Sequence, residues 1–319
     1  MAHLDQRSRG NDLVILTLGS DLSNWRSLSR WNGAIAVDLV DGYLGEPLWS
    51  WKRIFRGTYK TVTRQHRRPA LRYTSLLRGL LSASSGVICA SSEQKRKILE
   101  LNDNVVVTAD CMQELFDVPS FDKSGGDGVR LLWEGFPENL KHFHSIGPEL
   151  SRIRRSRRLA IDVVTDLSGV RRGSQKHIGG FISLMNDIGI EFDLSSWSVP
   201  QLAKSAERCD LGVIPIDPTD RMAWMKSENK LLSFWAMGLP ALTSPTPSYQ
   251  RLAHEGGLVD AYTTVDQWGD LIERYSMDNE TRIHASQLVR KLARERCTES
   301  AVDENWSEFL RTMGWDGSL

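Results

Sequence analysis

Residues 211–244 contain the pattern that most constrains the fold of this chain. The run Leu211–Ile216 is short, apolar and rich in β-branched residues, which is typical of a buried strand. A charged stretch follows at 226–230, and then apolar residues recur at helical spacing until Gly238 and Pro240 supply a stop signal. A second apolar run begins directly afterwards. This order predicts a strand–helix–strand unit whose first loop lies at the carboxyl end of a strand, where open α/β sheets bind ligands.

Strands and helices alternate through the rest of the chain as well, and this alternation favours parallel sheets. The first half contains four apolar runs, at 12–18, 34–40, 86–90 and 105–108. The second half contains five, at 129–133, 159–164, 190–194, 211–216 and 241–243. We therefore expect an α/β protein with two doubly wound, Rossmann-like domains, of which the N-terminal one is shortened.

A break between the two series lies at residues 118–128. This segment, VPSFDKSGGDG, is rich in Gly, Asp and Pro residues, a composition typical of an exposed connection. We expect an N-terminal domain over 1–122 and a C-terminal domain over 128–300. A last helix, within 301–319, is expected to cross back to the first domain.

Composition excludes several classes of protein. The 319 residues are 40% hydrophobic and 25% charged, as in ordinary globular domains. Lys plus Arg and Asp plus Glu are equal at 40 each, so net charge gives no argument for binding nucleic acid. The polar N-terminus and the absence of a long apolar run predict a cytoplasmic protein. Residues 47–78 are basic and contain Trp, so they form either a solvated face or a peripheral contact with the inner face of a membrane.

Common catalytic and cofactor motifs are absent from the sequence. It contains no GxGxxG after a strand, no GxxxxGK[ST], no GxSxG and no HExxH. Its four Cys and seven His residues are scattered without the spacing of metal ligands. We therefore expect neither a metal ion nor a bound cofactor.

Polar residues and glycines follow the strands of the second half where a ligand would bind. They are Gly135, Arg171, Arg172, Lys176, Asp217 and the stretch 226–230. In a parallel sheet these residues all reach one edge. Lys226 and Lys230 flank a predicted helix N-terminus, where backbone N–H groups and the helix dipole favour an anion such as a diphosphate. The alternative is that Ser227 or Glu228 only caps the helix and that both lysines are solvated.

Three segments together resemble a known family. AERCDLGVIPID followed by KSENKLLSFWAMGLPALTS resembles the donor-site region of glycosyltransferases of the GT-B fold. RLLWEGFPENL resembles the strand, glycine and loop that open the nucleotide-sugar domain of this fold. GVICASSEQKRKILELNDNVVVTAD resembles the last strand–helix–strand of the N-terminal domain in retaining, family-4-like members. These segments lie in the expected order within residues 86–244, a span of about half of the chain.

The resemblance implies transfer of a sugar from a nucleotide-diphosphate donor, without a metal ion, to a saccharide or lipid-linked acceptor. The N-terminal domain would hold the acceptor, across a cleft from the donor. Asn229 and Lys230 match the family's Asn-Lys pair at the diphosphate, and Arg171 or Lys176 would face the phosphates. The remaining residues assigned to the donor are Gly135, Asn139, Asp217, Glu228 and Ser233. Those assigned to the acceptor side are Gly19, Ser20, Asp38 and His66.

The sequence departs from the family pattern at two positions. Ser233 stands where the second Glu of a Glu-x7-Glu motif would bind the donor ribose, and Met225 stands at the first Glu. Glu228 lies three residues from that first position. A retaining reaction needs no protein nucleophile, whereas an inverting one needs a base, for which the candidates are Asp38, Asp41 and His66. Two alternatives to an active transferase therefore stay open, an inactive GT-B-like binding or scaffold subunit and a nucleotide-sugar epimerase.

Overall fold

The structure is a computed structural model, and it forms two compact units. The first contains 1–109, 225–227 and 302–319, and the second contains 110–224 and 228–301. Within these limits the structure describes residues 13–17, 20–22, 33–40, 44, 73–118, 128–168, 173–217, 219–220, 226–256 and 267–314.

The first unit contains a parallel sheet of four strands in the order β1-β2-β3-β4. These strands are β1 (Leu13–Thr17), β2 (Ala34–Leu39), β3 (Gly86–Cys89) and β4 (Val105–Val107). They coincide with the four apolar runs of the first half, so those strand predictions are confirmed. Helices α2 (Tyr73–Ala83) and α3 (Ser92–Ile98) bury their apolar sides against one face of the sheet.

The chain's last helix covers the other face of this sheet. Phe309 of α12 (Glu299–Thr312) is fully buried against Ala36 and Ile88, whose side chains alternate with those that face α2. The contact is close, since a Cβ at Gly86 would lie 2.7 Å from the Phe309 ring. The central strands β2 and β3 of this sheet are therefore buried on both faces, as strands of parallel sheets generally are, whereas Ile15 of β1 stays 43% exposed.

Residues 110–118 belong to the second unit, although the sequence analysis assigned them to the first domain. The backbone N–H of Met112 donates to the carbonyl of Cys297, at 2.8 Å. Arg290 donates to the carbonyl of Phe116 in η3 (Gln113–Asp117), at 2.7 Å. These contacts with α11 (Asn279–Cys297) join residues that are far apart in the sequence, Phe116 and Arg290 by 174 positions, so local sequence patterns do not reveal them.

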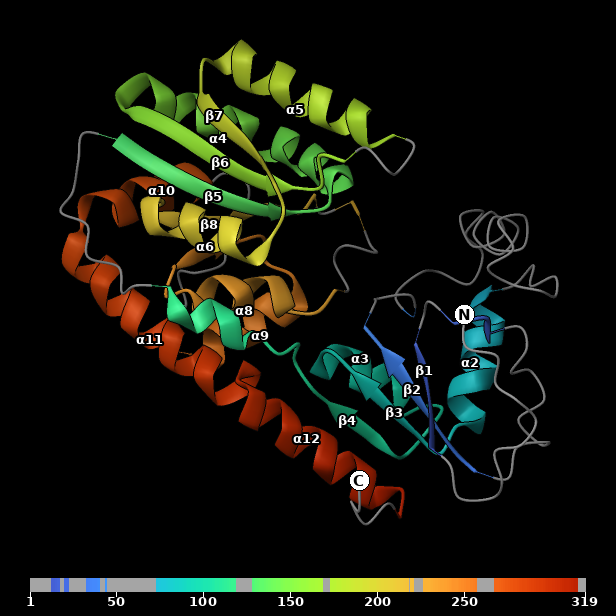
Figure 1. Cartoon of the computed structure of the whole chain (residues 1–319). Helices are drawn as coiled ribbons and strands as arrows, with labels where there is room; N and C mark the ends of the chain where they lie inside the picture. The colour runs from blue at the N-terminus through green and yellow to red at the C-terminus, as the bar shows by residue number, and fades with distance from the viewer. Residues whose placement is uncertain are drawn as a thin grey trace. The chain divides into compact units, whose positions relative to one another are not determined.

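The second unit contains a parallel sheet of five strands in the order β7-β6-β5-β8-β9 (Figure 1). These strands are β5 (Gly128–Gly135), β6 (Arg158–Thr165), β7 (Glu191–Ser196), β8 (Leu211–Ile214) and β9 (Ala241–Thr243), and they confirm the five predicted runs. Strand order reverses at β5, which pairs with β6 on one side and β8 on the other. In doubly wound folds, ligands bind at the carboxyl edge beside such a reversal.

Helices cover both faces of this second sheet. Four helices pack against one face, namely η4 (Pro137–His142), α4 (Phe143–Ser156), α5 (Ser174–Ile188) and α10 (Trp268–Met277). The rings of Phe143 and Phe181 meet edge to face there, with their centres 5.0 Å apart. The remaining helices are α6 (Val199–Arg208), α8 (Asn229–Ala236) and α9 (Pro247–Glu255). No helix among the described residues is long and apolar enough to cross a membrane.

Candidate functional site

Gly135 and Lys230 meet at the carboxyl edge of the second sheet. Gly135 is the last residue of β5 and has a φ of +145°, a conformation that favours glycine. A Cβ at this position would lie 2.6 Å from Nζ of Lys230. The ammonium also lies 5.0 Å from the centre of the buried Trp133 ring, within the range of a cation–π contact. Glycine thus lets a positive charge lie directly against the backbone where the strand order reverses.

The first turn of α8 carries this lysine. Glu228 is the N-cap residue of α8, but its side chain makes no capping hydrogen bond. Its carboxylate instead accepts from Arg251 of α9, with Oε1 and Nη2 2.5 Å apart. Of the alternative that Ser227 or Glu228 only caps the helix, the part that concerns Glu228 is therefore wrong. Glu228 thus leaves the N–H groups of the first turn of α8 without a bond from the N-cap side chain, and together with Lys230 these groups form a site suited to an anion.

His142 lies beside the same edge. The backbone N–H of Asp217, in the loop after β8, donates to Nδ1 of His142 at 3.1 Å. The imidazole is 2% exposed, and burial lowers its pKa to about 4, with a further lowering by the Lys141 ammonium. His142 is therefore neutral at pH 7, and its Nδ1 is the acceptor that ties the β8 loop to η4.

The two carboxylates of the loop after β8 accept hydrogen bonds from other groups of the protein. Oδ1 of Asp217 accepts from the backbone N–H and the hydroxyl of Thr219, at 2.8 and 2.7 Å, and these bonds lower the pKa of Asp217. Asp220 accepts from Lys141 at 2.6 Å. The carboxylate of Asp217, assigned to the donor from the sequence, thus stabilises a local turn in this structure.

Two further residues assigned to the donor make contacts within the protein. The side chain of Asn229 hydrogen-bonds to the carboxyl group of Asp110. The hydroxyl of Ser233 donates to the carbonyl of Asn229 one helical turn earlier, at 3.0 Å. Ser233 therefore satisfies its hydroxyl within α8, and of the predicted Asn229–Lys230 pair it is Lys230 that lies against Gly135.

The other predicted residues are spread over both units. Asn139 lies within η4, where its N–H donates to Phe136, and Lys176 is exposed on α5. In the first unit, Asp38 is half-buried in β2, and the backbone N–H of Ser20 donates to Thr17 at 2.9 Å. Five predicted positions lie outside the described residues, namely Gly19, Asp41, His66, Arg171 and Arg172.

Sequence reasoning missed three participants in this region, His142, Trp133 and Arg251. Their partners lie far along the chain: Asp217 is 75 residues from His142, and Glu228 is 23 residues from Arg251. Trp133 carried a signal, since an aromatic residue two positions before a strand-end glycine shares its face of the sheet. No local pattern identifies the other two.

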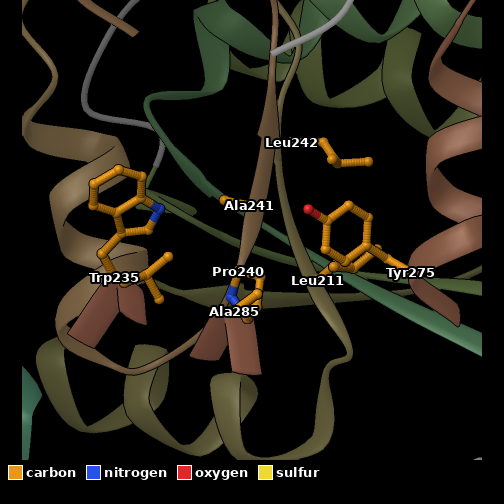
Figure 2. Close-up of a pocket in the computed structure, with 8 residues that line it drawn as sticks. Leu211, Trp235, Pro240, Ala241, Leu242, Tyr275 and Ala285 are labelled. Atoms are coloured by element: carbon orange, nitrogen blue, oxygen red, sulfur yellow. The ribbon is translucent and has the colours of Figure 1, made fainter. Parts of the chain in front are cut away.

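A small internal void lies at the opposite edge of the second sheet. Figure 2 shows the rings of Trp235 and Tyr275 on either side of Ala241, the first residue of β9, with Leu211, the first residue of β8, beside Tyr275. Its volume is about 10 Å³, barely that of one water molecule, and its lining is mainly apolar. This void is an imperfection of packing, too small for a ligand.

Titratable side chains do not gather into a metal site in the part of the chain that the structure describes. Groups of three or more His, Cys, Asp or Glu residues placed to hold an ion are absent there. The candidate site is instead defined by a lysine, a glycine and a helix N-terminus.

Several solved glycosyltransferases share the fold of this chain. Sucrose-phosphate synthase of Thermosynechococcus elongatus matches with a TM-score of 0.68 and 11% identity, over 95% of this chain and 73% of its own. HepE of Anabaena, solved with UDP, matches with a TM-score of 0.66 and 12% identity, over 94% of this chain and 79% of its own. A glycosyltransferase of Rickettsia africae matches with a TM-score of 0.61 and 9% identity, over 98% of this chain and 100% of its own. Neither a family model nor a curated protein sequence matches the chain. The similarity establishes that the chain has the GT-B fold.

Proposed function

We propose that this chain is a glycosyltransferase that takes its sugar from a nucleotide-diphosphate donor bound by the second unit. The observation that carries this proposal is the Lys230 ammonium, which lies against Gly135 in the first turn of α8, where the N-cap residue Glu228 makes no capping hydrogen bond. The fold supports it, since HepE of the same fold was solved with UDP and with UDP and glucose.

The chemistry of this edge suits a departing diphosphate. Negative charge develops on the leaving phosphate as the bond to the sugar breaks, and an ammonium and backbone N–H groups already in place stabilise it. We propose that Lys230 and the first turn of α8 fill this role without a divalent metal. Arg171 and Lys176 are further candidates to face the phosphates, and Asp41 is a candidate base on the acceptor side if the reaction inverts.

A thermal-shift screen of common nucleoside diphosphates and nucleotide sugars tests the proposal. We expect at least one nucleotide to raise the melting temperature, because a ligand that binds only the folded state stabilises it. If every nucleotide fails to bind at millimolar concentration, the proposal is wrong.

Product analysis with the bound nucleotide sugar separates the proposal from its two alternatives. A transferase forms a glycosylated product or slowly hydrolyses the donor, and EDTA leaves that rate unchanged if no metal is required. Conversion of the donor sugar without an acceptor would indicate an epimerase. Binding with no turnover under any condition would indicate a scaffold subunit, which the Ser233 departure motivates.

We propose a saccharide or lipid-linked molecule as the acceptor. The basic segment 47–78, most of which lies outside the described residues, motivates a peripheral membrane contact, because a lipid-linked acceptor requires access to a membrane surface. Flotation with anionic liposomes at low salt tests this contact, and absence of the protein from the lipid fraction would contradict it.

A further inference from the structure

Cys111 and Cys297 lie beside each other where the chain enters and leaves the second unit. That unit begins at Asp110 and ends at Ala301. Both cysteines are free thiols, of which Cys111 is exposed and Cys297, the last residue of α11, is buried. An exposed thiol therefore has a second, sheltered thiol as its neighbour within the same unit.

Two hydrogen bonds hold the segments of these cysteines together. The backbone N–H of Met112 donates to the carbonyl of Cys297 at 2.8 Å, and the backbone N–H of Glu299 donates to Oε1 of Gln113 at 3.3 Å. Because Met112 directly follows Cys111, standard peptide dimensions place the Cα atoms of the two cysteines no more than about 7.6 Å apart. Disulfides join Cα atoms about 4.4–6.8 Å apart, so a disulfide needs at most a small shift of the backbone.

The thiol of Cys297 has a weak partner within its own helix. It donates to the carbonyl of Ala293, one turn earlier in α11, at 3.0 Å. Thiols are weak donors, so rotation of this side chain towards Cys111 sacrifices little. Burial raises the pKa of Cys297 to about 12, and the nearby Cys111 adds to the rise. Cys297 is therefore a neutral thiol at pH 7, and the exposed Cys111 is the first to meet an oxidant in solution.

We propose that Cys111 and Cys297 form a reversible disulfide when the protein meets a small-molecule disulfide such as oxidised glutathione. First, the Cys111 thiolate attacks one sulfur of the oxidant, which forms a mixed disulfide and releases one glutathione. The Cys297 sulfur then loses its proton and attacks Sγ of Cys111, and the second glutathione leaves. The two cysteines lose two electrons and two protons in total, which the two glutathione molecules carry away as thiols.

This disulfide would close a loop that contains nearly the whole second unit. Cys111 lies one residue after the start of that unit, and Cys297 lies four residues before its end. A cross-link stabilises mainly by restricting the unfolded chain, and its effect grows with the length of the closed loop. Oxidation should therefore hold the two ends of the second unit together and raise its melting temperature.

Peptide mapping by mass spectrometry, on protein incubated with oxidised glutathione and not reduced afterwards, tests the proposal. We expect two peptides joined through Cys111 and Cys297, and dithiothreitol should separate them. Cys111→Ser, a change at an exposed position, should give no joined peptides. Cys209→Ser is the matched control, because Cys209 is a buried thiol of the same unit, and this variant should form the link as the unchanged protein does.

Thermal unfolding of the oxidised and reduced proteins measures the restraint. Oxidation should raise the melting temperature of the unchanged protein and of Cys209→Ser by about 5–10 °C, and dithiothreitol should reverse the rise. The melting temperature of Cys111→Ser should not respond to the oxidant.

Three results would overturn the pairing of the two thiols. They are a lasting glutathione adduct on Cys111 beside a free Cys297, a link between the Cys111 residues of two copies of the chain, and no reaction of either thiol. A joined pair that leaves the melting temperature unchanged would overturn the restraint and leave the modification site standing. None of these measurements involves a nucleotide, so they are independent of the proposed function.

Discussion

At the residue scale, the site depends on the absence of one side chain. Any residue other than glycine at position 135 would place its Cβ within 2.6 Å of the Lys230 ammonium and would have to adopt a φ of +145°. Both conditions penalise substitution, the first by displacing the charge and the second by backbone strain. A substitution of Gly135 should therefore change both the position of the Lys230 ammonium and the backbone at the end of β5.

His142 predicts a specific dependence of stability on pH. Its pKa is about 4 in the folded protein, below the ordinary value of 6.5, because the imidazole is buried. Between pH 6.5 and 4 the imidazole is therefore protonated in the unfolded chain but still neutral in the folded protein. The folded state keeps its full stability above pH 6.5 and loses stability as the pH falls towards 4. We expect about 3 kcal/mol of the free energy of unfolding to disappear over this range.

Urea unfolding of the unchanged protein and of His142→Gln at pH 7, 5.5 and 4.5 measures this dependence. The stability of His142→Gln should fall less steeply with pH than that of the unchanged protein. His144→Gln is the matched control, because His144 is exposed two residues further along the chain. If the free energy of unfolding of all three proteins falls equally with pH, His142 is not buried in its neutral form.

At the scale of elements, ion pairs link three strands and a helix of the second unit. Asp162 of β6 is buried, at 1% exposed, and accepts from Arg130 of β5 at 2.7 Å and from Arg208 of α6 at 2.5 Å. Asp193 of β7 accepts from the same two arginines at 3.3 and 3.1 Å but is half-exposed. The buried carboxylate lies on the opposite face of β6 from the apolar core.

Asp162→Asn should lower the free energy of unfolding by about 2–3 kcal/mol, because two charged hydrogen bonds lose their charged acceptor in a buried position. Asp193→Asn removes the charge from the exposed carboxylate that pairs with the same two arginines, and it should lower the free energy of unfolding by less than about 1 kcal/mol. Denaturant unfolding of the two variants compares them directly. Equal costs would show that burial of Asp162 does not determine the strength of these pairs.

The strands were predictable because buried parallel strands are nearly continuous apolar runs, as at Leu211 or Val129. Helix α5 was not predicted, although Ile178, Phe181 and Met185 follow helical spacing and are buried. Its first half contains Gly179 and Gly180, which weaken helix propensity, and packing against the sheet overrides that weakness.

The candidate site was predictable only in part. The rule that parallel strands end at one edge leads to Gly135 and Lys230. It does not say that Glu228 pairs with Arg251 or that Ser233 bonds to its own helix, because these choices depend on which side chains packing brings together.

At the scale of the whole molecule, the two ends of the chain build the first unit together. Phe309 is fully buried against Ala36 and Ile88, so Phe309→Ala should destabilise this unit by about 3–5 kcal/mol through lost burial and a cavity. Nucleotide binding by the second unit should persist below the new melting temperature. Thermal unfolding with and without nucleotide measures both effects.

Glu308→Ala is the control for this change, because Glu308 is exposed on the same helix. A Phe309→Ala variant as stable as Glu308→Ala would contradict the role of α12 in closing the sheet.

The central claim is that the second unit binds a nucleoside diphosphate through Lys230, and calorimetric titration of Lys230→Ala tests it most directly. Loss of a charged contact to phosphate should weaken binding roughly 10- to 100-fold relative to the unchanged protein. Lys204→Ala, which removes an exposed lysine of α6, should bind as the unchanged protein does. Equal affinities of all three proteins for the nucleotide would contradict the account.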